Sequence, residues 1–290
     1  MYGEKGMIII YITDDTIDKF IKEDIPYIDL TTLILDIGKK KGKIEFISRE
    51  NATISGTEEI VRIFKKLNIK IIEYMPSGTN VLAGEVVLGG EGYAQDLHMA
   101  WKLSSNILEY CSGIATRTRT LVDRAKKINP KIELFTTRKV FPGTKELSIK
   151  SAIAGGAYPH RLGLSETILI FEKHMNFMNG VDGLISQFEN IKSKACEKKI
   201  IVEVESLEDA IKFSKAGVDG IQFDKIPPKD LKSMVEEVRN IDYKITLIGT
   251  GGINSNNVEE YAKTGVDAIS TTWVYFGKPV DFGTNIVRIK

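Results

Sequence analysis

Short β-rich runs alternate with helical patterns through the second half of this 290-residue chain. The last four expected strands follow one another at the spacing of a strand plus a helix. Strands that alternate with helices pair in parallel through right-handed crossovers. The rhythm therefore predicts an α/β fold, a closed or nearly closed six-stranded α/β barrel over about residues 115–275. Its expected strands are residues 132–136, 167–171, 200–204, 220–223, 245–248 and 268–271.

Helix signals fill the gaps between these strands. Ser206 begins a capping-box pattern, and Gly217 suits the left-handed residue that ends a helix. Asn254 or Ser255 is expected to cap a helix over 258–263. These signals support the alternation of strands and helices.

The first part of the chain has a different pattern and predicts a separate α+β domain. A long helical run over 93–110 leads out of it, and a lone strand over 281–289 is expected to return to it. The expected domains are residues 1–114, joined by a strand within 279–290, and a barrel over 115–278. The other elements expected in the first domain are helices 14–22 and 57–67 and strands 42–48, 70–74 and 86–90.

Composition excludes several classes of protein. The 40 basic and 39 acidic residues give a net charge of +1, which argues against nonspecific nucleic-acid binding. The two cysteines, Cys111 and Cys196, cannot form a disulfide scaffold or a structural zinc site. No apolar run approaches the ~18 residues of a membrane span, and the start lacks the layout of a signal peptide. We expect a cytoplasmic protein, in which Met7 is an alternative start that would leave residues 1–6 extraneous.

Basic residues concentrate in one segment, 136–161, which carries a net charge of +4 and also His160. Arginine presents a fixed fork of donors that matches phosphate and carboxylate groups. The segment therefore indicates an anionic ligand, and a solvated basic face is the alternative. Its charged residues are Arg138, Lys139, Lys145, Glu146, Lys150 and Arg161.

A glycine-rich loop over 249–252 lies between the fifth expected strand and a helix. Exposed backbone N–H groups at such a position form a phosphate cradle, and late loops of α/β barrels are frequent phosphate sites. A plain tight turn is the alternative. Thr250, Gly251 and Gly252 are the candidate phosphate ligands, with Thr271 at the end of the sixth strand.

Two carboxylates emerge from adjacent expected strands, Glu203 and Asp224. Paired carboxylates can hold Mg²⁺, bind ribose hydroxyls or stabilise a cationic transition state. In a barrel strand the alternation of faces is expected to direct Glu203 inward. Surface solvation is the alternative for Asp224.

Several ordered motifs resemble quinolinate phosphoribosyltransferases. The strongest are Thr-Thr-Arg-Lys-Val-Phe-Pro-Gly at 136–143 and Ala-Gly-Gly-Ala-Tyr-Pro-His-Arg-Leu-Gly-Leu-Ser-Glu at 154–166. Others are Ser-Gly-Ile-Ala-Thr at 112–116, Val-Glu-Val-Glu-Ser-Leu at 202–207, Gln-Phe-Asp at 222–224 and Thr-Gly-Gly-Ile at 250–253. Residues 159–171 are similar to the ModD branch of this family, pyrophosphorylases associated with molybdenum utilisation.

The resemblance implies a sandwich domain followed by a six-stranded barrel, in a homodimer or higher oligomer whose active site is shared between subunits. It implies transfer of ribose 5-phosphate from phosphoribosyl pyrophosphate (PRPP), with Mg²⁺, to a small anionic aromatic acid. The implied catalytic residues are Glu203, Asp224 and Lys139, with Glu203 and Asp224 also at the metal. The implied substrate-binding residues are Lys102, Arg138, Lys139, His160, Arg161, Phe171 and His174, and the implied phosphate-binding residues are Thr250, Gly251, Gly252 and Thr271.

Four positions depart from the family pattern. Lys102 replaces an arginine, Phe171 a lysine, Ile248 a glutamate, and Phe276 falls near a family histidine. The part of the family's site that binds the two carboxylates of quinolinate thus has one cation fewer in this sequence. Three readings follow: a ModD-like transferase acting on an aromatic N-heterocyclic acid, a genuine quinolinate phosphoribosyltransferase of NAD biosynthesis, or a non-enzymatic anion-binding protein linked to molybdate.

Overall fold

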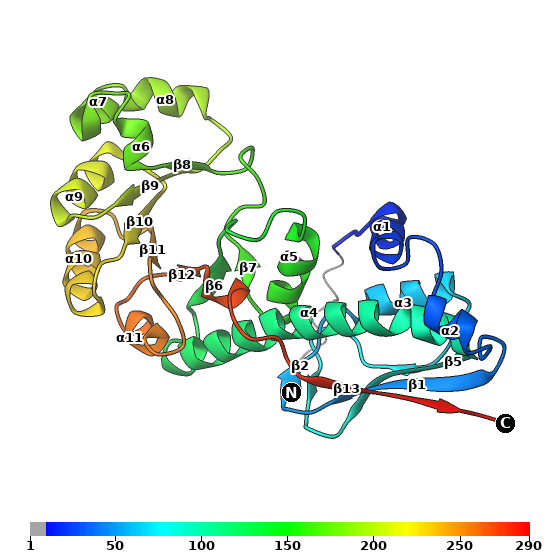
Figure 1. Cartoon of the computed structure of the whole chain (residues 1–290). Helices are drawn as coiled ribbons and strands as arrows, with labels where there is room; N and C mark the ends of the chain where they lie inside the picture. The colour runs from blue at the N-terminus through cyan, green and yellow to red at the C-terminus, as the bar shows by residue number, and fades with distance from the viewer. Residues whose placement is uncertain (1–9) are drawn as a thin grey trace. The chain divides into compact units, whose positions relative to one another are not determined.

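The computed structural model describes residues 10–290, so the alternative start at Met7 lies outside the described residues. The chain forms two compact units (Figure 1). The first comprises residues up to 119 together with 141–156 and 275–290, and the second comprises 120–140 and 157–274. The segment 141–156, which the sequence places inside the barrel, therefore belongs to the first unit.

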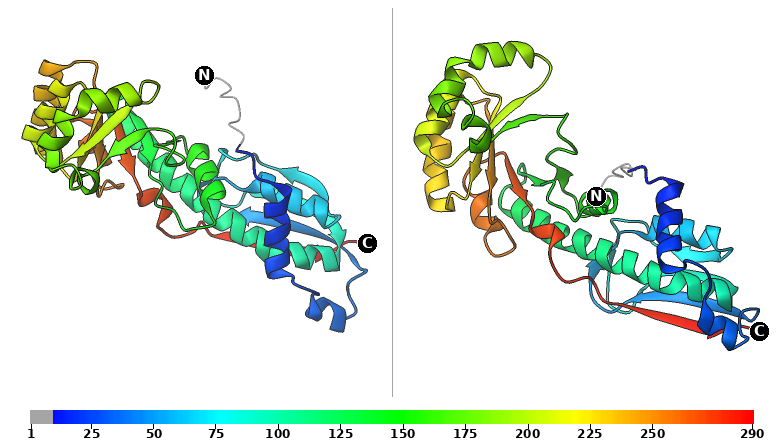
Figure 2. Two further views of the ribbon diagram at one scale, coloured as in Figure 1. Left: turned by 90° about the horizontal axis from the view of Figure 1, so that it is seen from above. Right: turned by 45° about the horizontal axis from the view of Figure 1, so that its top comes forward.

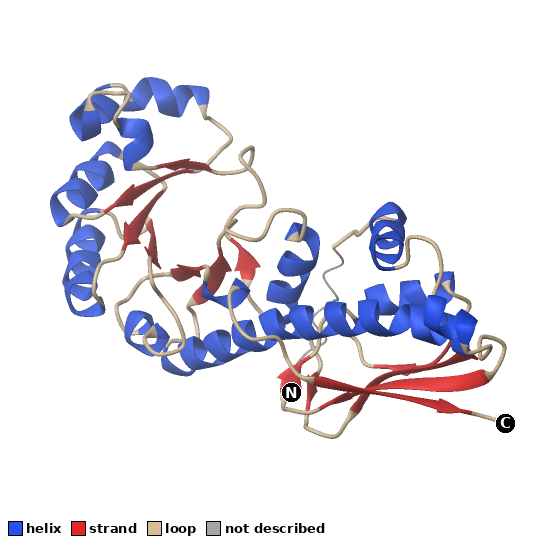
Figure 3. Ribbon diagram, viewed as in Figure 1, coloured by secondary structure: helices blue, strands red, loops and turns tan. Residues whose placement is uncertain are grey.

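The first unit contains a four-stranded antiparallel sheet in the order β13-β1-β5-β3 (Figure 3). Buried and less buried residues alternate along β1, which buries Ile44 and Phe46 against Phe64 and its neighbours on α3. The expected strand over 281–289 is β13, which pairs with β1. The bounds are β1 Lys41–Ser48, β3 Lys70–Tyr74, β5 Val86–Tyr93 and β13 Phe282–Arg288, with a small pair β2 Ala52–Thr53 and β4 Asn80–Val81.

Helices α3 and α4 lie against one face of this sheet (Figures 1 and 2). Helix α4 runs from Ala94 to Ile128 and is much longer than the expected helix over 93–110. Gly113 lies inside this helix, and its missing side chain leaves room for the backbone of Pro279: a Cβ at Gly113 would lie 3.1 Å from Pro279 Cα. The other helices are α1 Asp14–Asp24, α2 Leu30–Ile34 and α3 Thr57–Lys66.

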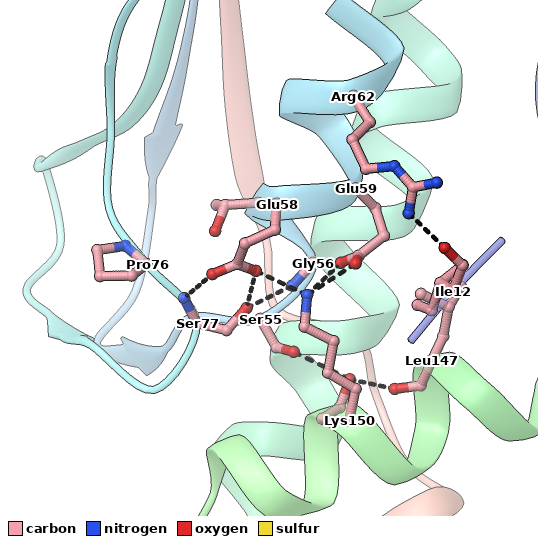
Figure 4. Close-up of polar contacts among 12 residues, drawn as sticks. Ile12, Ser55, Gly56, Glu58, Glu59, Arg62, Pro76, Ser77, Leu147 and Lys150 are labelled. Carbon is pink, nitrogen blue, oxygen red and sulfur yellow. Dashed lines mark hydrogen bonds and ion pairs between the residues drawn. The ribbon is translucent and has the colours of Figure 1, made fainter. Parts of the chain in front are cut away.

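Helix α5 (Lys145–Ala154) is fixed to the first unit by a buried ion-pair cluster (Figure 4). Lys150 Nζ lies 2.7 Å from Glu58 Oε2 and 2.6 Å from Glu59 Oε2. Burial raises the pKa of Glu58, but the charge of Lys150 and hydrogen bonds from Lys150 and Ser77 outweigh it and lower that pKa overall. Ser151 accepts a hydrogen bond from Ser55 at 3.1 Å. The ammonium group of Lys150 is thus already paired with two carboxylates of the first unit.

The second unit is built on a parallel sheet in the order β7-β6-β12-β11-β10-β9-β8 (Figure 3). All six expected strands are present, but the expected count of six is wrong because Tyr158–Pro159 adds a seventh, β7, beside β6. The two edge strands, β7 and β8, do not pair, so the sheet is open. The bounds are β6 Glu133–Thr136, β7 Tyr158–Pro159, β8 Ile168–Ile170, β9 Ile200–Val204, β10 Gly220–Asp224, β11 Thr246–Thr250 and β12 Ala268–Thr271.

The helix signals of the second unit are largely confirmed. Ser206 Oγ accepts from the backbone N–H of Asp209 at the start of α9 (Leu207–Ala216), and Gly217 ends it with φ 79°. The prediction that Asn254 or Ser255 caps α11 (Val258–Ala262) is wrong: Asn257 is the cap residue, and Asn254 Oδ1 instead accepts from Asn256 N. The remaining helices are α6 Glu172–Met175, α7 Gly180–Ser186, α8 Phe188–Lys194, α10 Pro228–Ile241 and the short 3₁₀ helix Trp273–Tyr275.

Across residues 10–290 no helix is both long enough and apolar enough to cross a membrane.

Candidate functional site

The parallel sheet presents one face whose buried residues are apolar and whose strand ends carry mostly polar residues. Leu169, Ile201, Ile248 and Ala268 come from four strands and form one buried cluster, so they share a face. Residues two apart on a strand point the same way. The next positions on this face are therefore Phe171, Glu203, Thr250 and Ser270, at the carboxyl ends of β8, β9, β11 and β12.

Glu203 and Asp224 lie close together on neighbouring strands. Gln222 is opposite Glu203 in the register of β9 and β10 and donates from Nε2 to Glu203 Oε2 at 2.6 Å. Burial raises the pKa of Glu203, the hydrogen bond from Gln222 opposes that rise, and the negative charge of Asp224 adds to it. The positive charges of Lys225 and Lys139 have a weaker effect and lower the pKa of Glu203. The structure thus brings together three of the predicted site residues, Glu203, Asp224 and Lys139.

The turn after β10 packs directly onto the glycine loop after β11. Lys225 has φ 57° and donates its backbone N–H to Thr250 O at 2.9 Å, while its Nζ lies 2.6 Å from Asp224 Oδ2. A Cβ on Gly251 would lie 2.6 Å from Asp224 Oδ1 and 2.5 Å from Lys225 Cγ. A side chain at 251 would displace Asp224 or Lys225, so the close packing of the two turns requires glycine there.

The glycine loop offers backbone donors to solvent. Gly251 and Gly252 both have positive φ, 89° and 71°, and a Cβ at Gly252 would meet no atom within 4 Å. Their N–H groups donate to no backbone or side-chain group among residues 10–290. Consecutive free N–H groups at a strand-to-loop junction form a concavity that binds anions. The geometry therefore fits a phosphate held by backbone amides.

The threonines predicted at this site are used differently. Thr250 Oγ1 donates to Ser270 O at 3.1 Å. Thr271 is on the opposite face and donates from Oγ1 to Ile253 O at 2.6 Å, while accepting from Trp273 N. Both hydroxyls hold neighbouring loops together. In the structure, the two hydroxyl groups therefore help to shape the phosphate cradle through these hydrogen bonds.

Arg138, His160 and Arg161 form a basic group at the ends of β6 and β7. His160 donates its backbone N–H to Thr136 O at 2.9 Å, which continues the pairing of the two strands. Burial lowers the pKa of Arg161, and the nearby charge of Arg138 lowers it further. Burial and the charge of Arg161 lower the pKa of His160, whose buried Nε2 has no hydrogen-bond partner among residues 10–290. The positive charges of Arg138 and Arg161 lie close together, and such an arrangement favours an anionic ligand.

Three residues of the basic and substrate-binding sets do not join this cluster. Lys102 belongs to the first unit, where its Nζ lies 4.6 Å from the centre of the Trp101 ring. Lys150 is paired with Glu58 and Glu59 in that same unit. His174 Nδ1 accepts from the backbone N–H of Phe171 at 3.0 Å, so the imidazole caps the start of α6.

Sequence reasoning did not assign Gln222 and Lys225 to the site. Gln222 precedes Asp224 by two residues, so strand alternation alone could have placed it beside Glu203. The left-handed backbone of Lys225 has no sequence signal, because the residue is not a glycine. Among residues 10–290 no group of three or more histidine, cysteine or acidic side chains is placed to hold a metal.

Two family models together match most of the chain. Residues 29–112 match the N-terminal domain of quinolinate phosphoribosyl transferase, and residues 114–284 match its C-terminal domain. A protein of Pasteurella multocida named as the pyrophosphorylase ModD is 33% identical over 273 residues, which cover 94% of this chain and 97% of that protein. A protein of Methanothermobacter thermautotrophicus named as a carboxylating nicotinate-nucleotide pyrophosphorylase is 30% identical over 279 residues, covering 95% and 99%.

The same fold occurs in a solved relative. The crystal structure of nicotinate-nucleotide pyrophosphorylase from Ehrlichia chaffeensis superimposes with a TM-score of 0.87 at 24% identity, over 96% of this chain and 99% of that one. The resemblance inferred from the motifs at 136–143 and 154–166, including its ModD-like character, is confirmed. The chain belongs to the quinolinate phosphoribosyltransferase family.

Proposed function

We propose that this protein is a ModD-like phosphoribosyltransferase that moves ribose 5-phosphate from PRPP to an aromatic N-heterocyclic acid and releases pyrophosphate. One observation carries the proposal. A carboxylate pair, a basic group and a glycine loop with free N–H groups all stand at the carboxyl ends of one parallel sheet. These are the three kinds of group that a polyanionic sugar donor needs. The family membership points to the same reaction class.

The two anionic ends of PRPP have separate candidate ligands. Gly251 and Gly252 present backbone donors suited to the 5′-phosphate. Arg138 and Lys139 follow β6 and are exposed, so their cations are available to the leaving pyrophosphate. Neutralising that leaving group lowers the barrier to cleavage of the C1–O bond. The acceptor nitrogen would then form the new bond to C1.

Glu203 and Asp224 would act on the ribose. As pyrophosphate departs, positive charge develops on the sugar, and fixed carboxylates stabilise it. Their free oxygens also suit ribose hydroxyl donors. Gln222 holds the Glu203 carboxylate in one orientation, at 2.6 Å.

Mg²⁺ fits this carboxylate pair as an ion that arrives with the substrate. The pKa of Glu203 is raised by burial and by Asp224, so a divalent cation would relieve the repulsion between these charges. Mg²⁺ commonly binds one or two carboxylates together with substrate phosphates and water. Such an ion would supply further charge neutralisation to the pyrophosphate.

The acceptor would bind beside His160 and Arg161. Arg161 provides a forked cation for a carboxylate, and the unpartnered Nε2 of His160 provides a buried polar atom nearby. Phe171, directly after β8, and His174 on α6 would approach the acceptor from the other edge of the sheet, with their rings 5.7 Å apart.

We also propose that the protein is a homodimer or higher oligomer with a shared site, the second unit being the family's barrel and the first its sandwich domain. Lys102 is exposed on the first unit and would enter the partner's site. A contiguous exposed apolar stretch supports association, since monomers rarely expose such patches. Its members are 60–89% exposed: Tyr27, Ile28, Leu30, Leu33, Ile34 and Leu35.

Isothermal titration with PRPP and Mg²⁺ tests this function. Binding should be saturable and should weaken at least about tenfold in Arg138→Ala and Lys139→Ala, since each variant removes a charge-assisted contact. Lys232→Ala, a surface lysine on α10, is the matched control. Absence of binding at millimolar PRPP contradicts the proposal. Molybdate binding that survives both Lys139→Ala and Glu203→Ala would favour a non-enzymatic anion-binding protein instead.

A further inference from the structure

An aromatic surface lies on the same sheet face as Glu203. Phe135 on β6 and Phe171 after β8 both pack against the buried cluster that contains Ile201. Ile201 precedes Glu203 by two residues on β9, so the cluster and the carboxylate point the same way. Leu169 pairs with Ile201 in the register of β8 and β9, so Phe171 is level with Glu203, and Phe135 pairs with Ser270 at the end of β12. The two phenyl rings therefore share the strand-end region of the face that carries the proposed ribose ligand.

Each phenyl ring is fixed by an imidazole. The rings of Phe171 and His174 are stacked at 5.7 Å and 28°, and those of Phe135 and His160 meet edge to face at 6.0 Å and 89°. The hydrogen bond from Phe171 N to His174 Nδ1 ties the first pair to the start of α6. Because both Phe135 and Phe171 are only partly buried, each keeps an accessible surface. Each phenyl thus presents an apolar face, held by its imidazole neighbour, against which a flat ring could stack.

Charge is distributed unevenly around this surface. Arg138 and Arg161 are at the β6 and β7 end, close enough for Arg138 to lower the pKa of Arg161. At the β8 end the inward position is Phe171, an uncharged ring, and the next two residues, Glu172 and Lys173, are exposed on α6. An anionic group on a bound ring would thus meet cations at one edge only. A second carboxylate at the other edge would lose water without gaining a partner.

We propose that Phe135 and Phe171 form the acceptor-binding surface and that it selects a planar nitrogen heteroaromatic ring bearing a single carboxylate. Phe171 is then a specificity-determining residue. This inference rests on the proposed function for the identity of the reaction, but ring binding itself is independent of PRPP. A ring with two adjacent carboxylates, such as quinolinate, would be disfavoured because its second carboxylate faces the Phe171 phenyl.

Direct titration of two pyridine acids tests the proposal. Nicotinate carries one carboxylate and quinolinate two adjacent ones. The wild-type protein should bind nicotinate at least about tenfold more tightly than quinolinate. Phe171→Lys supplies the missing cation and should reverse that ratio, whereas Phe171→Leu should weaken both ligands and keep the ratio. Thermal melting of each variant reports whether it folds.

The outcomes separate this inference from the proposed function. Equal or tighter quinolinate binding by the wild-type protein overturns the inference, as does an unchanged ratio in folded Phe171→Lys. If neither acid binds at millimolar concentration while PRPP does, the inference is wrong and the phosphoribosyltransferase proposal stands. If nicotinate binds selectively and PRPP does not, the inference is supported and the proposed function fails.

Discussion

Gln222 donates a 2.6 Å hydrogen bond to the carboxylate of Glu203, directly across the register of β9 and β10. That bond opposes the rise in the Glu203 pKa that burial and Asp224 produce. In Gln222→Leu the carboxylate loses this donor, so its pKa should rise further. If ionised Glu203 stabilises the transition state, the acid limb of the pH–rate profile should move to higher pH. Pyrophosphate release measured from pH 5 to 8 would show this, and an unmoved limb would exclude that role for Glu203.

Gly251 has no room for a side chain because Asp224 Oδ1 and Lys225 Cγ lie 2.6 and 2.5 Å from where its Cβ would be. Gly251→Ala should displace the Asp224 turn and raise the KM for PRPP by at least about tenfold. Gly84→Ala is the matched control: its φ of 94° is similarly positive, but no atom lies within 4 Å of its Cβ position. The control should cost only about 1 kcal/mol of stability and leave KM unchanged. Equal effects of the two variants would show that backbone strain, and not contact with Asp224, is responsible.

Lys150 neutralises two carboxylates, of which Glu59 is 4% and Glu58 23% exposed at the side chain. Lys150→Met would leave both uncompensated and should lower the free energy of unfolding by about 3 kcal/mol. Adding Glu58→Gln and Glu59→Gln to that variant should recover much of the loss, since no buried charge then remains unpaired. Urea unfolding measures both. Arg62→Met, on the same helix as Glu59 but paired with the exposed Asp14, should have a smaller effect.

Subunit mixing tests whether Lys102 acts on the partner's site. Lys102→Ala and Lys139→Ala dimers should each be nearly inactive. Unfolding and refolding them together should restore about a quarter of wild-type activity, because half of the dimers would be hybrids with one intact site. No recovery from a mixture shown to contain hybrids would place Lys102 and Lys139 of one chain in the same site. A fully active Lys102→Ala dimer would place Lys102 outside any site.

Local patterns in the sequence predicted much of this fold. The strand spacing located six parallel strands, and Ser206 and Gly217 marked the two ends of α9. The two-residue β7 was missed because so short a strand has no periodicity, and it is defined by pairing with β6. Helix α4 was predicted to end at 110, whereas it continues through Gly113, whose contact with Pro279 is nonlocal.

The candidate site shows the same division. Motif spacing singled out Glu203, Asp224 and the glycine loop, and strand alternation puts Glu203 and Thr250 on one face. Charge counting misplaced Lys150, since its partners Glu58 and Glu59 are about ninety residues away in sequence. Charge counting also could not show that His174 Nδ1 already accepts a hydrogen bond from Phe171 N. Long-range pairing decides which members of a charged segment remain available to a ligand.

The most direct test of the central claim is the PRPP-dependent release of pyrophosphate in the presence of Mg²⁺ and an aromatic N-heterocyclic acid. We expect one pyrophosphate for each ribosylated acid, with both products lost in Glu203→Gln and Asp224→Asn although these variants still fold. Pyrophosphate release that persists in both variants, or no release by the wild-type protein with any such acid at saturating PRPP, would contradict the account.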